Sequence, residues 1–379
     1  MTVSESEPSI IFGLDFQART MTPIHGDVER VRFAIGTQSL KATNQVYLLE
    51  VEEDSNQIVT KAFPHPEGEL WHVDAHPEQQ ELIATSYSYV DQNRQNMKCA
   101  VWRMSGTADN MGSPSSERGA LECVSTFATP SPHVACFHWR PPVGGSSDKA
   151  FVLHGTNLTL VDALFQGKEM TALSSVAVES KSHGRFQAGK WNPHHDSNMI
   201  VAAVDCAVRS WDIRSMKEAF SIKSAHAPTV RDLDLNANRQ YVLATAGDDS
   251  KIRIWDMRSV DQPLKTIAGH SHWVWCVRFN PTHDQLLLSC SSDAAVILHA
   301  APSVSSEALD ATADDDETGA TEPRLKDGVI GSYGEYEESV YCCDWSPADP
   351  WTYASLSYDG RIIVNRVPSS VKYAILEAL

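Results

Sequence analysis

One stretch of the chain, VRDLDLNANRQYVLATAGDDSKIRIWD at residues 230–256, carries the pattern that decides the fold. Its landmarks are an asparagine after the first apolar run, an aspartate in a tight turn, and a closing Trp-Asp pair. The landmarks recur 44 residues earlier and 44 residues later, as Asn192, Asp205 and Trp211-Asp212, as Asn236, Asp249 and Trp255-Asp256, and as Asn280, Asp293 and His299-Ala300. Three landmarks in register over two periods identify an internal repeat.

A shorter unit, apolar-x-x-apolar-x-apolar, extends the repeat along the chain. Its seven starts are predicted at Ile11, Leu70, Val134, Phe186, Val230, Val274 and Val340. Alternating and β-branched residues favour short strands, and Gly and Asp favour the turns between them. Four strands per period of about 40–45 residues predict an all-β, seven-bladed β-propeller without a helix of useful length. The last outer strand comes either from residues 371–376 or from the N-terminal segment.

Length and charge restrict the function. The chain has 379 residues, 49 of them acidic and 31 basic, and a formal net charge of −18. This charge argues against a protein that wraps nucleic acid and against non-specific adhesion to anionic lipid. No stretch approaches about 18 consecutive apolar residues, so no membrane span is predicted. We expect one propeller over residues 1–379, although the length alone suggests two or three domains.

Two segments interrupt the repeat. The interval between the sixth and seventh units exceeds the period, and the excess, residues 303–328, contains Asp314-Asp315-Asp316-Glu317. We expect an acidic, disordered insertion there, solvated or docking a basic partner. Residues 105–119 are rich in Ser and Gly and are expected to form a flexible loop.

The eight cysteines have no CxxC spacing, and several lie in apolar runs. They stand at positions 99, 123, 136, 206, 276, 290, 342 and 343. This usage predicts reduced, buried thiols in a cytosolic protein.

The Trp-Asp pairs at 211–212 and 255–256 and the Gly269-His270 pair resemble the WD40-repeat family. In that family, matching residues form a buried network that ties a loop His to a turn Asp. The residues expected in the network are His226, Thr245, Asp249, Trp255, His270, Ser289, Asp293 and Asp359. Ser or Thr, His and Asp also make a hydrolytic triad. A set that recurs in successive repeats indicates structure, because a satisfied polar network rigidifies its blade.

Other enzyme and metal signatures are weak. His194-His195-Asp196 offers zinc-ligand types, but the polarity of the turn that follows Trp191-Asn192-Pro193 explains them. The sequence contains no P-loop, no GxGxxG after a strand and no GxSxG elbow. We therefore predict no catalytic residue, cofactor or metal.

The repeat places large side chains on the top rim of the propeller, around the start of each first strand. The predicted partner-binding residues are Trp71, Arg231, Trp273, Trp275, Tyr341 and Tyr358. Exposed Trp, Tyr and Arg are the side chains that dominate binding hot spots. The alternative is that these tryptophans pack between blades.

Further stretches go beyond the general repeat. They include GLDFQAR at 13–19, GTQSLK at 36–41, HSHWVW at 270–275, ASLSYDGR at 354–361 and NRVP at 365–368. Together they resemble the family of EARP- and GARP-complex-interacting WD-repeat proteins. The resemblance implies a non-enzymatic, cytoplasmic scaffold that reaches endosomes and the trans-Golgi network through vesicle-tethering complexes, without binding nucleic acid. It implies roles in endosomal recycling, endosome-to-Golgi retrograde transport and dense-core vesicle maturation.

A second family resemblance gives a different function. Trp211-Asp212-Ile213-Arg214 and Trp255-Asp256-Met257-Arg258 are WDxR motifs. They resemble the signature of substrate receptors for cullin-4 ubiquitin ligases, in which the arginine meets the DDB1 adaptor. The alternative function is therefore substrate recruitment to such a ligase through Arg214 and Arg258.

Overall fold

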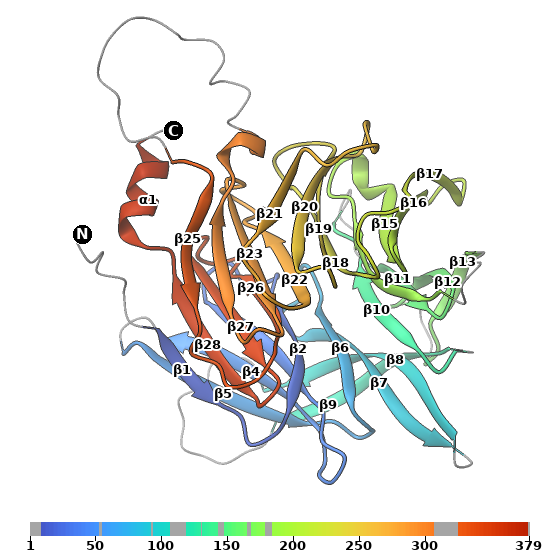
Figure 1. The fold of residues 1–379 in the computed structure, drawn as a ribbon. Coiled ribbons are helices and arrows are strands. Elements are labelled where there is room, and N and C mark those ends of the chain that lie inside the picture. The colour runs from blue at the N-terminus through green and yellow to red at the C-terminus, as the bar shows by residue number, and fades with distance from the viewer. Residues whose placement is uncertain are drawn as a thin grey trace, which may run out of the picture.

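Seven four-stranded antiparallel sheets follow one another around a common centre (Figure 1). The computed structural model describes residues 9–52, 55–91, 94–106, 119–129, 131–142, 148–164, 168–178, 184–306 and 325–377. The innermost strand of each sheet contacts the innermost strands of both neighbouring sheets. The predicted seven-bladed propeller is therefore confirmed.

Each blade runs from an inner strand at the channel to an outer strand at the periphery. Blades one to three comprise β2 (Ala18–Pro23), β3 (Arg32–Thr37), β4 (Gln45–Glu52) and β5 (Gln57–Pro64); β6 (Leu70–Ala75), β7 (Leu82–Asp91), β8 (Arg94–Ser105) and β9 (Ala120–Ala128); and β10 (Val134–Trp139), β11 (Lys149–His154), β12 (Asn157–Asp162) and β13 (Thr171–Ala177). Blades four to six comprise β14 (Phe186–Trp191), β15 (Met199–Val204), β16 (Ala207–Asp212) and β17 (Lys217–Ile222); β18 (Val230–Leu235), β19 (Val242–Gly247), β20 (Lys251–Asp256) and β21 (Lys265–Ala268); and β22 (Val274–Phe279), β23 (Leu286–Ser291), β24 (Val296–Ala300) and β25 (Gly328–Tyr333). Blade seven comprises β26 (Val340–Trp345), β27 (Thr352–Ser357), β28 (Arg361–Arg366) and β1 (Ile10–Gly13).

The N-terminal strand closes the ring. β1 pairs antiparallel with β28, from Ile10 opposite Val364 to Gly13 opposite Arg361, and Figure 1 shows the two strands side by side. The N-terminal alternative is therefore confirmed, and the alternative strand at residues 371–376 is wrong. Those residues belong to helix α1 (Ser369–Leu376), which the sequence analysis did not anticipate. Because β1 already occupies the edge of β28, the chain after Pro368 has no strand to pair with there, and Ile375 instead packs against blade seven.

Six of the seven predicted inner-strand starts are confirmed, and the first is wrong. β6, β10, β14, β18, β22 and β26 begin at the predicted residues. Ile11 lies in the outer strand of blade seven, and the inner strand of blade one is β2, which begins at Ala18. Ile11, Leu14 and Phe16 have the apolar spacing of an inner strand, but Ile11 lies in the edge strand β1, and Leu14 and Phe16 follow that strand.

Apolar clusters between successive blades hold the ring together. The cluster between blades two and three, for example, combines Leu82 and Val101 with Phe137, Trp139 and Val152. Burial of such side chains stabilises the fold by about 1.5–3 kcal/mol each. Two 3-10 turns, His195–Ser197 and Pro302–Val304, complete the regular structure of the described residues.

Most residues of the two predicted irregular segments lie outside the described parts of the structure. Residues 307–324 of the predicted insertion 303–328, and residues 107–118 of the predicted loop 105–119, lie outside the described residues. The described residues that flank each segment lie after the third strand and before the fourth strand of their blade, at the rim opposite the starts of the inner strands. Among the described helices, none is long and apolar enough to cross a membrane.

Candidate partner-binding site

A β-bulge interrupts every inner strand after its first residue. In β18 the register moves from Val230 opposite Gly247 to Asp232 opposite Ala246, so Arg231 has no ladder partner. A bulge re-aims the extra side chain. The bulged residues in blade order are Arg19, Trp71, Ala135, Gln187, Arg231, Trp275 and Tyr341. All seven line the central channel at the end where the inner strands begin, and we call them the mouth ring.

Five consecutive members of the mouth ring form a chain of aromatic rings and guanidinium groups in contact with one another. The Arg231 guanidinium carbon lies 4.6 Å from the centre of the Trp275 ring. Trp275 and Tyr341 follow with ring centres 4.9 Å apart. The Arg19 guanidinium carbon then lies 4.2 Å from Tyr341, 5.0 Å from Trp275 and 5.7 Å from Trp71. Such cation–π contacts fix each side chain in place.

Polar contacts and two further aromatic residues support this chain. Arg231 donates to both carboxylate oxygens of Asp248, at 2.5 and 2.9 Å. Trp275 Nε1 donates to Ser292 Oγ at 2.6 Å. Trp273 lies 5.1 Å from the Arg231 guanidinium carbon. The predicted rim residues therefore lie together, with Tyr358 in edge-to-face contact with Tyr341 at 5.8 Å between ring centres.

Exposure separates two kinds of rim residue. Trp71 and Trp273 are 39% and 41% exposed, and large aromatic side chains at this exposure are available to a partner. Trp275, Tyr341 and Tyr358 are half-buried and support their neighbours. The alternative reading, packing between blades, therefore describes Trp275 better than it describes Trp71.

Arg19 was missed by the sequence analysis. It occupies in blade one the position that Trp71 and Arg231 occupy in theirs, but the first inner strand was assigned to Ile11 instead of Ala18. The signal that could have found it is the run Ala18–Pro23, which fits the apolar-x-x-apolar-x-apolar unit and overlaps the quoted motif GLDFQAR.

The channel below the mouth ring has a volume of about 1000 Å³. Its charged lining residues are Arg19, Arg185, Lys190, Arg231, Arg278, Asp74, Asp232, Asp234 and Asp344. Arg278 forms ion pairs with Asp232 and, at 3.6 Å, with Asp344. Asp74 lies 3.1 Å from His138 Nδ1 and accepts the Trp139 N–H at 3.0 Å.

The predicted structural network is assembled in blade five. His226 Nδ1 lies 2.7 Å from Asp249 Oδ1, and its Nε2 lies 2.8 Å from Thr245 Oγ1. Trp255 Nε1 donates to the same Thr245 oxygen at 2.9 Å. Gly247 makes room for the imidazole, since a Cβ there would lie 2.4 Å from His226 Cγ. The contacts link a loop, a strand and a turn, as in a structural network.

The residues of the equivalent networks differ in blades six and seven. In blade six, His270 contacts Asp293 at 3.0 Å and Ser289 at 2.8 Å, and His299 replaces the tryptophan at 2.8 Å from Ser289. In blade seven, Tyr336 replaces the loop His and its hydroxyl contacts Ser355. Asp359 is not brought to a loop His in that blade.

Blade seven uses its turn aspartate differently. Asp359 contacts the Ser357 hydroxyl, and its Oδ1 accepts the Arg361 N–H at 3.3 Å. Blade two contains a network that the repeat did not predict, in which Trp102 Nε1 donates to Thr85 Oγ1 at 2.8 Å and His65 Nε2 lies 3.2 Å from the same oxygen. Blade two lacks the Trp-Asp signature, and only the order His, Thr, Trp indicated the match.

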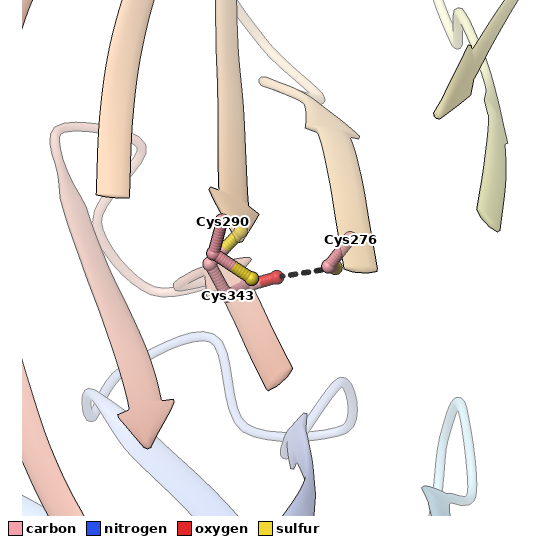
Figure 2. A group of neighbouring side chains, drawn as sticks. All are labelled: Cys276, Cys290 and Cys343. Carbon is pink, nitrogen blue, oxygen red and sulfur yellow. Dashed lines mark hydrogen bonds between the residues drawn. The ribbon is translucent and has the colours of Figure 1, made fainter. Parts of the chain in front are cut away.

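Three cysteines from three strands meet between blades six and seven (Figure 2). Cys276 of β22, Cys290 of β23 and Cys343 of β26 have sulfur atoms within 4.8 Å of one another. Thiolates at such distances suit a soft metal ion. Here the Cys276 thiol donates to the Cys343 carbonyl at 3.4 Å, and burial with neighbouring thiols raises the pKa of Cys290 well above its ordinary value. Buried thiols within an apolar cluster act as core packing.

The two imidazoles of the 194–196 turn point to different neighbours. His194 Nε2 lies 2.9 Å from the Asn236 carbonyl oxygen. The His195 ring packs against Tyr241, with ring centres 5.9 Å apart. Each imidazole therefore has a structural contact of its own.

The WDxR arginines lie at the rim opposite the mouth ring, after the third strands of blades four and five. Arg214 and Arg258 are exposed, and each is paired with the aspartate of its own motif, with a shortest distance of 2.7 Å. The hydrogen bonds from Arg214 lower the pKa of Asp212 to about 2. Both guanidinium groups are thus oriented by the aspartates that precede them.

The chain is similar to known proteins over nearly its full length. It is 41% identical to EARP and GARP complex-interacting protein 1 of Rattus norvegicus over 386 residues, which cover 98% of this chain and 100% of that protein. It is 36% identical to EARP-interacting protein 1 of Caenorhabditis elegans over 372 residues, with 97% and 99% covered. It is 34% identical to WD repeat-containing protein DWA2 of Arabidopsis thaliana over 359 residues, with 94% and 95% covered.

Family models agree with these similarities. A WD domain, G-beta repeat, matches residues 329–364 in blade seven. The EIPR1 beta-propeller model matches residues 6–299, which form most of the first six blades. The chain therefore belongs to the EIPR1 beta-propeller family.

Proposed function

We propose that this chain is a non-enzymatic WD-repeat adaptor that binds the EARP and GARP vesicle-tethering complexes through its mouth ring. The observation that carries the proposal is the arc of Arg231, Trp275, Tyr341, Arg19 and Trp71, which is organised before any partner binds. Rigid aromatic and arginine side chains at a concave mouth are typical of binding hot spots. The names of the relatives support the choice of partner.

In this proposal the chain acts in the cytoplasm and reaches endosomes and the trans-Golgi network through the tethering complexes. Its cellular roles are endosomal recycling, endosome-to-Golgi retrograde transport and dense-core vesicle maturation. The complex-based names of the relatives support this setting.

Affinity purification with mass spectrometry tests the proposal. The wild-type chain is expected to recover EARP and GARP subunits, and Trp71→Ala is expected to reduce that recovery at least tenfold, as hot-spot truncation does. Tyr373→Ala is the matched control, because Tyr373 is an exposed aromatic residue on α1 outside the mouth ring. Equal recovery by all three proteins would contradict the proposed binding site, and no tethering subunits with wild type would contradict the function.

A second function is supported by the WDxR arginines. Arg214 and Arg258 are 72% and 64% exposed and are held in one orientation by Asp212 and Asp256. Such a presentation fits an adaptor such as DDB1 and leaves the mouth ring free. The double variant Arg214→Ala and Arg258→Ala should lose DDB1 in co-purification, whereas the nearby exposed Lys217→Ala should not. Unchanged DDB1 recovery would contradict this second function.

A further inference from the structure

Arg19 differs from the other arginine of the mouth ring in its partners. Arg231 is paired with Asp248, whereas among the described residues no carboxylate lies within ion-pair distance of Arg19. Its guanidinium faces Tyr341, Trp275 and Trp71, and burial lowers its pKa. A partly buried cation without an anion is costly unless a ligand provides one.

Two further cations of the channel resemble Arg19 in lacking an ion pair. Within the described part of the chain, the lining cations Arg185 and Lys190 also have no ion-paired carboxylate. The lining carboxylates are occupied by protein donors, since Asp232 and Asp344 pair with Arg278 and Asp234 accepts the Phe279 N–H at 2.9 Å. Asp74 is held by His138 and Trp139, as described above. The lining therefore holds five cations and four carboxylates, and Arg19, Arg185 and Lys190 are its cations that make no ion pair with a described residue.

We propose that the mouth ring and channel receive an acidic, extended peptide segment of a partner protein, with one carboxylate bound by Arg19 and a second by Lys190. This rests on the proposed function, and it names the chemistry of the segment that a tethering complex would present. The surrounding aromatic rings hold the Arg19 guanidinium in a fixed position, and a preorganised arginine binds a carboxylate through two parallel hydrogen bonds.

Strand geometry sets the spacing of the acidic residues. Arg19 is the second residue of its inner strand and Lys190 the fifth of its own, so Lys190 lies about 10 Å deeper along the channel at 3.3 Å per residue. An extended peptide spans that depth in about three residues. Two acidic residues separated by two others fit this spacing.

The position of the chain's own acidic insertion favours a partner's segment, rather than the insertion itself, as the occupant of the channel. Ser306 and Leu325, the described residues on either side of the insertion, lie between the third and fourth strands of blade six and therefore at the opposite rim. A negative segment of a partner that approaches the mouth ring meets cations there, although the chain as a whole is acidic. Charge complementarity of this kind selects the binding orientation.

Binding of purified EARP complex to the full-length chain, measured at several salt concentrations, tests the inference. Arg19→Gln and Lys190→Gln are expected to weaken binding at least tenfold and to reduce its salt dependence, and Arg19→Lys is expected to retain part of the affinity. Lys251→Gln is the matched control, since it removes one exposed positive charge beside the blade-five turn on the same rim. Thermal unfolding verifies that each variant is folded. Hexaglutamate should compete with EARP, and hexaglutamine should not.

Different outcomes contradict different claims. If Trp71→Ala loses EARP while Arg19→Gln and Lys190→Gln bind like wild type, the acidic-segment inference is wrong and the proposed function stands. If neither Trp71→Ala nor the charge variants change binding, the mouth ring is not the binding site. Competition by inorganic phosphate but not by hexaglutamate would overturn the carboxylate assignment. Tighter hexaglutamate binding after deletion of residues 307–324 would show that the chain's own segment occupies the channel and would overturn the partner assignment.

Discussion

His226 on the loop before blade five lies 2.7 Å from Asp249 in the turn after β19, so one hydrogen bond ties two connections of the same blade. Arg253 also donates to Asp249, at 2.6 Å. Asp249→Ala removes the carboxylate that accepts from both donors, although Arg253 keeps the Ala225 carbonyl, and we expect it to lower the free energy of unfolding by about 2 kcal/mol. Urea denaturation measures this loss.

Asp359→Ala is the control for the effect of the loop His. Asp359 occupies the same turn in blade seven, where Tyr336 stands in place of the loop His and contacts Ser355 instead. Its replacement should cost less than that of Asp249. Equal losses of unfolding free energy would show that the hydrogen bond between His226 and Asp249 contributes no extra stability.

The pKa of Asp249 predicts that part of the free energy of unfolding is lost at low pH. Burial would raise the pKa of Asp249, but the hydrogen bonds from His226 and Arg253 outweigh burial and hold this pKa at about 2. The ordinary value is about 3.9, so the unfolded chain binds the proton more tightly. The stabilisation is therefore complete above about pH 4 and is lost as the pH falls towards about 2.

Asp249→Asn removes this titration. The difference in unfolding free energy between wild type and Asp249→Asn should shrink between pH 5 and pH 3 in urea titrations. Asp359→Asn provides the same change of charge without the loop His. A wild-type advantage that stays constant over this range would contradict the assigned role.

The fold was predictable where the repeat is regular. Trp211-Asp212 and Trp255-Asp256 set the period, and the inner strands of blades two to seven begin where the apolar spacing predicts. The first start failed because periodicity alone does not distinguish an inner strand from the β1 edge strand. That pairing joins Ile10 to Val364 across almost the whole chain, and local sequence contains no signal for it.

The site was predictable in part for the same reason. Trp71, Arg231, Trp275 and Tyr341 follow from the repeat because each comes second in a correctly placed strand. Arg19 was not predicted because the first inner strand was assigned to the wrong residues. The bulge that turns these side chains into the channel depends on backbone register, which residue types alone do not specify.

Removal of residues 1–13 tests the ring closure. It deletes β1, leaves the edge of β28 unpaired, and uncovers the cluster against which Ile10 and Phe12 pack. We expect a loss on the order of 3 kcal/mol in unfolding free energy, with aggregation through the exposed edge. Thermal unfolding with light scattering measures both, and removal of residues 1–8 alone is the control. Equal stability of the two truncated proteins would mean that β1 does not contribute to closure.

Variants of Trp275 and Trp71 are expected to distinguish a residue that stabilises the mouth ring from a residue that contacts the partner. Trp275 Nε1 donates to Ser292, which also receives the Ser339 hydroxyl at 3.0 Å, whereas Trp71 is 39% exposed. Trp275→Ala should therefore lower both the melting temperature and EARP recovery, and Trp71→Ala should lower recovery alone. Trp275→Phe keeps a ring beside Arg19 and Arg231 but loses the Nε1 donor, so it should cost about 1 kcal/mol of stability and retain most of the binding. Comparable destabilisation by Trp71→Ala and Trp275→Ala would mean that both tryptophans serve packing between blades, since a contact residue does not stabilise the free protein.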